Sequence, residues 1–168
     1  LLQLFTLLAI DIPPLCEEDR KECQRFLESV AQAKSQLLTQ IQLPPREAIY
    51  LGQYERYREE VGNPHSQVET LVYLPFYLSS KRWQGVPFRM LTGKKMAERE
   101  SYIEVVFHSH FPEDNRLRIE IQPEERIDLL IRAKAPGLGL YSSPVRLNFS
   151  YSGSFGANTP EAYEKIIY

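Results

Sequence analysis

A group of basic residues directly after a glycine turn is the part of this sequence best suited to bind an anion. Residues 86–90 have the apolar pattern of a short strand, and Thr92-Gly93 is typical of a turn. Lys94, Lys95 and Arg99 follow. Such a turn exposes backbone N–H donors, and lysine or arginine beside it can bind a phosphate or an acidic substrate. By spacing alone, a solvated charged loop after a strand is the simpler interpretation.

Gln122 is a second candidate binding residue. Residues 116–122 alternate strictly, so Leu117, Ile119 and Ile121 lie on one face of a predicted strand. Gln122 lies on the polar face, where its amide would hydrogen-bond a sugar hydroxyl. By pattern alone it is also an ordinary surface glutamine.

The histidines suggest a metal site only weakly. His108 and His110 would share one face of a strand, with Glu113 or Asp114 nearby. No third ligand has a fixed spacing, so a strand that runs into an exposed polar loop is the better interpretation. We expect no metal.

Glycine patterns exclude nucleotide-binding domains from this sequence. Gly137-Leu138-Gly139 follows a proline and lies between predicted strands, which indicates a turn. No GxGxxG unit between a strand and a helix occurs, and no GxxxxGK[ST] sequence occurs. These 168 residues therefore contain neither a dinucleotide-binding nor a P-loop domain.

The composition is that of a folded domain with a nearly neutral charge. Hydrophobic residues make up 43% and charged residues 25% of the chain, and the formal charge is -2. That charge excludes a bulk basic field for nucleic acid.

Residues 1–10 are apolar but too short to span a membrane and lack signal-peptide features. With two cysteines, these features favour a cytoplasmic protein. Because the chain begins with leucine, we expect it to be part of a longer protein.

The predicted elements place helices first and strands after them. Helices are expected in residues 1–10 and 17–38, where Phe26, Val30 and Leu37 recur at helical spacing. Residues 68–78 fit either a buried strand or a helix. Strands are expected at 48–54, 86–90, 102–108, 116–122, 127–133 and 145–151, and a last helix begins at Thr159-Pro160-Glu161. This order predicts an α+β fold with a large, mostly antiparallel sheet and helices packed on one face.

Several of these segments, in this order, resemble glucose-6-phosphate dehydrogenase. The residues that carry the resemblance are LLQLFTLLAIDIPP at 1–14, GQY at 52–54, YREE at 57–60, RWQGVPF at 82–88, TGK at 92–94, ER at 98–99, NRLRIEIQP at 115–123 and PEAYEKII at 160–167. RWQGVPF followed by TGK is the most specific match. The resemblance covers essentially the whole chain, so residues 1–168 are expected to form one C-terminal domain for substrate binding and oligomerisation.

The resemblance implies an oxidoreductase of glucose metabolism, in the pentose phosphate pathway. In this family glucose 6-phosphate is oxidised to 6-phosphogluconolactone, and NADP bound by an N-terminal dinucleotide-binding domain accepts the hydride. A histidine acts as the base on the C1 hydroxyl. That domain and that histidine are not among these residues, so we expect the isolated fragment to be inactive and to hold no catalytic residue and no cofactor site.

By the same resemblance, Lys94 matches the substrate-binding lysine of the family. Arg99 matches a second basic position at the substrate, and Gln122 matches a glutamine that contacts the substrate in some members. Two departures, Leu91 and Glu120 at positions where arginine is expected, argue against a second, structural NADP. The implied partners are glucose 6-phosphate and further copies of the chain, as a homodimer or homotetramer through the sheet. The alternative is a non-catalytic sugar-phosphate-binding or oligomerisation module.

Overall fold

The computed structural model describes residues 2–12, 20–108 and 115–156. The chain divides into two compact units, Leu1–Met96 and Ala97–Tyr168. Each unit is described by itself. The single domain expected over residues 1–168 stays a prediction.

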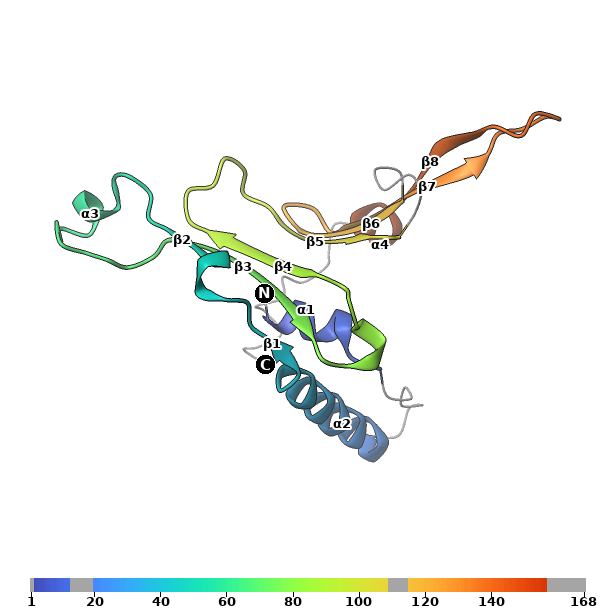
Figure 1. The fold of residues 1–168 in the computed structure, drawn as a ribbon. Helices are drawn as coiled ribbons and strands as arrows, with labels where there is room; N and C mark the ends of the chain where they lie inside the picture. Colours follow the sequence, from blue (N-terminus) through green and yellow to red (C-terminus); the bar gives the residue numbers. More distant parts are fainter. Residues whose placement is uncertain (1, 13–19, 109–114, 157–168) are drawn as a thin grey trace. The chain divides into compact units, whose positions relative to one another are not determined.

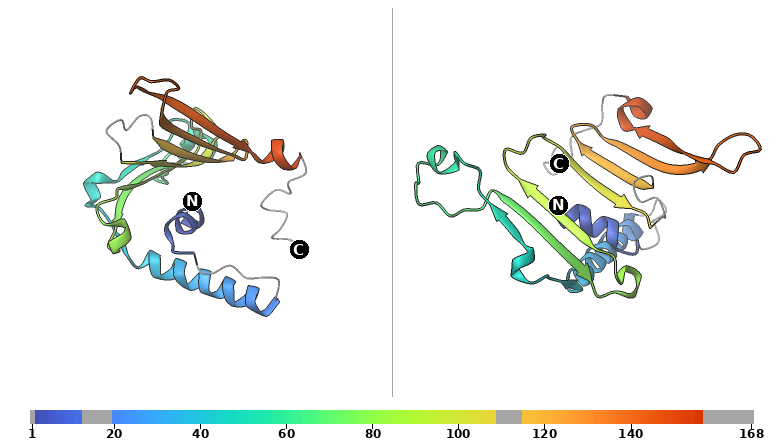
Figure 2. Two further views of the ribbon diagram at one scale, coloured as in Figure 1. Left: turned by 90° about the vertical axis from the view of Figure 1, so that its right-hand side faces the viewer. Right: turned by 45° about the horizontal axis from the view of Figure 1, so that its top comes forward.

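The first unit begins with the two predicted helices. Helix α1 covers Leu2–Ala9 and helix α2 covers Arg20–Leu38. Both lie on one face of the sheet that follows, as the blue helices in Figure 2 show. Leu37 of α2 is buried against this sheet, while most of the helix surface is polar. Both predicted helices are therefore confirmed within the described residues.

A four-stranded antiparallel sheet follows the helices (Figure 1). Its strands are β1 Ile41–Gln42, β2 Tyr50–Gly52, β3 Leu71–Leu78 and β4 Phe88–Gly93. The central strand β3 pairs with each of the other three. The segment that fitted a strand or a helix is thus a strand. Two 3-10 helices, Arg46–Ala48 and Lys81–Trp83, and the short helix α3, Tyr57–Glu60, lie in the connections.

Aromatic side chains join α1 to the sheet. Phe5 of α1 makes edge-to-face contacts with Phe76 and Phe88, whose ring centroids lie 5.1 and 5.3 Å away. Phe76 and Phe88 stack on each other, and Trp83 contacts Phe88. Trp83 also donates a hydrogen bond from Nε1 to the Ala9 carbonyl at 2.9 Å. Residues more than 70 positions apart thus form the core of the first unit.

The second unit is an antiparallel meander. Strands β5 Ser101–Val106, β6 Arg116–Gln122, β7 Arg126–Lys134 and β8 Ser142–Ser150 pair in chain order. The Gly137 turn closes the β7–β8 hairpin, as predicted. The strand predicted at 145–151 ends one residue earlier, at Ser150. Tyr151 instead begins a five-residue helix, α4 Tyr151–Phe155. Ser150 begins this helix because its hydroxyl accepts a hydrogen bond from the Gly153 N–H at 3.3 Å.

The alternation of the strands gives this second sheet two different faces. One face is apolar and includes Ile119 of β6, Ile127 of β7 and Phe149 of β8, which are aligned by the strand register. The other face carries charged side chains, among them Arg118 and Arg126. The strand predicted for residues 116–122 is therefore confirmed, although its most buried residue, Glu120, lies on the charged face.

The predicted α+β fold with antiparallel strands is confirmed, and the strands are distributed over two four-stranded sheets. The expected helix at the end of the chain lies outside the described residues. No helix in the described part of the chain has both the length and the apolar character to span a membrane.

Candidate functional site

Lys94 directly follows β4, because Thr92 and Gly93, which the sequence predicted as a turn, are the last residues of that strand and pair with β3. Its backbone N–H donates to the Thr70 carbonyl at 2.8 Å, while its side chain is exposed. A Cβ atom on the preceding Gly93 would lie 2.8 Å from Met96 Sδ and 2.9 Å from Leu71 Cδ1. The Met96 and Leu71 side chains would therefore have to move to admit a side chain at position 93. The TGK sequence thus places an exposed lysine on a backbone that is closely held.

Thr70 connects the Lys94 backbone to the GQY segment. Its buried side chain accepts a hydrogen bond from the Tyr54 N–H at 2.9 Å, and its own N–H donates to the Gly52 carbonyl at 2.7 Å. Gln53 donates from Nε2 to the Val68 carbonyl at 2.8 Å. The three residues of GQY are therefore bound to the segment that leads into β3, one hydrogen bond from Lys94.

Glu60 of α3 links the GQY segment to Lys95, the residue after Lys94. One carboxylate oxygen accepts a hydrogen bond from the Tyr54 hydroxyl at 2.8 Å, and the other pairs with the Lys95 ammonium. The Lys95 hydrogen bond, with that of Tyr54, lowers the pKa of Glu60, and the bond to Glu60 raises the pKa of Tyr54. The sequence did not identify Glu60 as part of the candidate site. Its partner Lys95 is 35 positions away, so spacing carried no signal.

The other two predicted site residues belong to the second unit. Gln122 is exposed at the end of β6, where it pairs with Ser101 of β5. Arg99 is exposed two residues before Ser101. Arg99 and Gln122 thus lie near the same end of the β5–β6 pair. Lys94 belongs to the first unit, and the substrate-binding role of all three residues stays a prediction.

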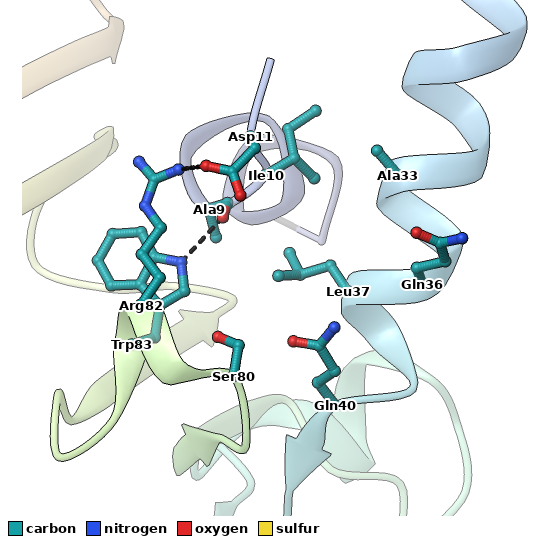
Figure 3. Close-up of a pocket in the computed structure, with 10 residues that line it drawn as sticks. All are labelled: Ala9, Ile10, Asp11, Ala33, Gln36, Leu37, Gln40, Ser80, Arg82 and Trp83. Atoms are coloured by element: carbon teal, nitrogen blue, oxygen red, sulfur yellow. Dashed lines mark hydrogen bonds and ion pairs between the residues drawn. The ribbon is translucent and has the colours of Figure 1, made fainter. Parts of the chain in front are cut away.

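A pocket of about 260 Å³ lies elsewhere in the first unit, between α1, α2 and the 3-10 helix Lys81–Trp83 (Figure 3). Arg82 pairs with Asp11 at its edge. Inside it, Gln40 Oε1 and Ser80 Oγ are buried without a hydrogen-bond partner. None of the predicted site residues lines this pocket.

Metal ligands do not gather in the described part of the chain. Across residues 2–12, 20–108 and 115–156, no three His, Cys, Asp or Glu side chains are grouped so that they would hold an ion. His108 is exposed after β5. His110, Glu113 and Asp114 lie outside the described residues.

Glu120, which stands where the resemblance expects arginine, is a buried carboxylate on the charged face of the second sheet. It is 6% exposed and pairs with Arg126 at 2.7 Å and with Arg118 at 3.6 Å. Arg118 also pairs with Glu100 at 2.7 Å and lies over the Tyr102 ring. The positive charges around Glu120 are therefore already balanced by carboxylates.

The comparison with family models decides the relationship. The model of the glucose-6-phosphate dehydrogenase C-terminal domain matches residues 1–168. This chain belongs to that family.

Individual family members agree. Glucose-6-phosphate 1-dehydrogenase of Chlamydia trachomatis is 33% identical over 99% of the chain and 42% of its own length. The Mycolicibacterium smegmatis enzyme is 43% identical over 66% of the chain and 24% of its own length. A solved glucose-6-phosphate dehydrogenase in complex with glucose 6-phosphate superposes with a TM-score of 0.75 at 30% identity, over 99% of this chain and 36% of its own. The chain thus spans roughly a quarter to two fifths of these family members.

Proposed function

We propose that this chain is the C-terminal part of a glucose-6-phosphate dehydrogenase, which oxidises glucose 6-phosphate to 6-phosphogluconolactone with NADP as hydride acceptor. The main support is the family match over residues 1–168. It is strengthened by the likeness to a solved relative in complex with glucose 6-phosphate.

Lys94 is the substrate residue with the strongest support. Its ammonium has no hydrogen-bond or ion-pair partner among the described residues, although the backbone beneath it is fixed to Thr70. An exposed, unpaired cation on an anchored backbone is suited to bind a phosphate dianion. Arg99 would add a second cation, and the Gln122 amide would bind a sugar hydroxyl.

The binding of the nicotinamide cofactor and the removal of the C1 hydroxyl proton are assigned to parts of the protein other than these residues. The described residues include no glycine-rich unit between a strand and a helix, so they do not fit the site of a nicotinamide cofactor. NADP, when bound by the rest of the protein, supplies the hydride acceptor. The base on the C1 hydroxyl is also assigned to the rest of the protein, and the 168 residues alone are therefore inactive.

Assembly and location complete the proposal. Val145, Leu147 and Phe149 are 39, 54 and 38% exposed on the apolar face of the second sheet. Exposed apolar side chains on one sheet face favour an interface, which supports a homodimer or homotetramer through the sheet. The reaction is assigned to the cytoplasm.

Replacing Lys94 tests the substrate site. In the full-length protein, Lys94→Ala removes a charge-assisted hydrogen bond worth about 1.5–3 kcal/mol, so KM for glucose 6-phosphate should rise about 10- to 150-fold. Lys81→Ala removes an exposed lysine from the 3-10 helix Lys81–Trp83 and should leave KM unchanged. Steady-state NADPH formation measures both. An unchanged KM in Lys94→Ala would contradict the role of Lys94.

A further inference from the structure

Lys95, next to the proposed phosphate ligand, has an unusual backbone conformation. Its φ is 53°, the only positive φ of a non-glycine residue within the described part of the chain. Left-handed backbone is unfavourable for a residue with a Cβ and persists only where the surroundings hold it. The conformation of the turn after Gly93 therefore needs an explanation from the contacts of Lys95.

Two side chains of another segment provide these contacts. The Lys95 ammonium pairs with Glu60 and lies 4.7 Å from the centre of the Tyr54 ring. The Tyr54 hydroxyl in turn donates to the second oxygen of Glu60 at 2.8 Å. Tyr54, Glu60 and Lys95 thus contact each other in a closed triangle, which we call the Lys95 clamp.

The clamp is fixed at its base by backbone and ring contacts. Tyr54 is held by the bond from its N–H to Thr70 Oγ1 at 2.9 Å and by an edge-to-face contact with Tyr57, whose ring centroid lies 5.4 Å away. The Lys94 N–H donates to the carbonyl of the same Thr70 at 2.8 Å. Thr70 therefore binds both the Lys94 backbone and the base of the clamp.

Overall stability is a poor explanation for this arrangement. The Lys95 and Glu60 side chains are 55 and 37% exposed, and ion pairs at such positions contribute about 0–1 kcal/mol to folding. The pair does, however, connect the side chain of the left-handed residue to another segment. Without Glu60, Lys95 is free to relax to a negative φ, which would rotate the peptide unit that it shares with Lys94.

We propose that Glu60 and Tyr54 are positioning residues that hold Lys95 in its left-handed conformation and thereby aim the Lys94 ammonium at the phosphate of the sugar phosphate. This inference rests on the proposed function of Lys94. It assigns a role to the YREE segment, whose Glu60 contacts Lys95 and Tyr54. A displaced ammonium weakens phosphate binding without altering the hydride transfer step.

The test is a set of variants of the full-length enzyme with glucose 6-phosphate and NADP. Glu60→Ala should raise KM about 3- to 30-fold with kcat nearly unchanged, because only substrate binding is weakened. Glu59→Ala is the matched control, since Glu59 lies on the same short helix as Glu60 but pairs with Arg56, which precedes the helix. Lys95→Ala should resemble Glu60→Ala, and the double variant should be no worse than either single variant. Melting temperatures should stay within about 2 °C of wild type.

The outcomes separate the clamp from the function on which it rests. If Lys94→Ala leaves KM unchanged, the proposed site itself is wrong. If Lys94→Ala raises KM while Glu60→Ala does not, or if Glu59→Ala raises it equally, only the clamp is overturned. Should Glu60→Ala fail to fold, Tyr54→Phe decides. It removes only the hydroxyl that binds Glu60 and should raise KM about 2- to 5-fold. A wild-type KM in that variant would overturn the clamp.

Discussion

The three hydrogen bonds of Thr70, with Gly52, Tyr54 and Lys94, form a junction that can be tested without measuring enzyme activity. Thr70→Val replaces a hydroxyl with a methyl group of nearly the same size. The Tyr54 N–H, which donates to that hydroxyl at 2.9 Å, then loses its partner. The two backbone hydrogen bonds of Thr70, to Gly52 and from Lys94, do not involve the side chain and should persist. The variant therefore removes one bond of three.

The expected size follows from the burial of the site. Thr70 is 7% exposed, so water does not readily replace the lost hydroxyl. A polar group left unsatisfied in such a place costs about 1–3 kcal/mol. Because each 1.4 kcal/mol is a factor of ten, the Tyr54 amide should exchange its hydrogen about 5 to 150 times faster.

Hydrogen exchange resolved at single amides in the full-length protein measures this directly. The Tyr54 amide should accelerate in Thr70→Val, while the Lys94 amide should keep its wild-type rate. Thr70→Ser is the control, because it keeps the hydroxyl and should leave the Tyr54 rate close to wild type.

Two results would refute the reasoning. Unchanged exchange at Tyr54 in Thr70→Val would mean that the hydroxyl does not protect that amide. Equal acceleration at Tyr54 and Lys94 would mean that the whole junction opens together, so that the backbone bonds of Thr70 depend on its side chain. The first result would remove the proposed link between the GQY segment and Thr70. The second would contradict the expectation that the Lys94 hydrogen bond is independent of the Thr70 side chain.

Two further predictions concern the core and the assembly. Phe76→Ala removes a side chain that is 2% exposed and contacts two other aromatic rings, so it should lower the free energy of unfolding by about 3–5 kcal/mol in urea titrations. Tyr77→Ala, on the neighbouring strand position and 47% exposed, should cost less than about 1 kcal/mol, and equal losses would contradict the described core. Light scattering of the full-length protein should give the mass of two or four copies, whereas a monomer at micromolar concentration would exclude the proposed interface.

Local patterns predicted most elements of the fold. The alternation of residues 116–122 defined β6, because one covered face requires a period of two. Residues 68–78 remained open between a strand and a helix because apolar and aromatic side chains follow one another without a period. Pairing of β3 with three other strands resolves the choice, and no local pattern contains that information.

The candidate site was predictable only in part. Lys94 and Arg99 stood out because basic residues follow Thr92-Gly93, which the pattern predicted as a turn and which ends β4. The hydrogen bond that holds the Lys94 backbone comes from Thr70, 24 positions earlier. Glu60 looked like one acidic residue among several on a short segment. Its contact with Lys95 arises because α3 lies near the end of β4 in the folded chain. The spacing of residues in the sequence does not predict that proximity.

The meander of β5 to β8 has a consequence for the order of folding. Each strand pairs with its neighbour in sequence, so every contact of this sheet closes a short loop. The core of the first unit instead requires Phe5 to meet Phe76, 71 positions away. Low contact order allows fast folding, so the second unit, which is synthesised after the first, should acquire its strands rapidly. The first unit must close a loop of about 70 residues before its core forms, so it should fold more slowly although it is synthesised first.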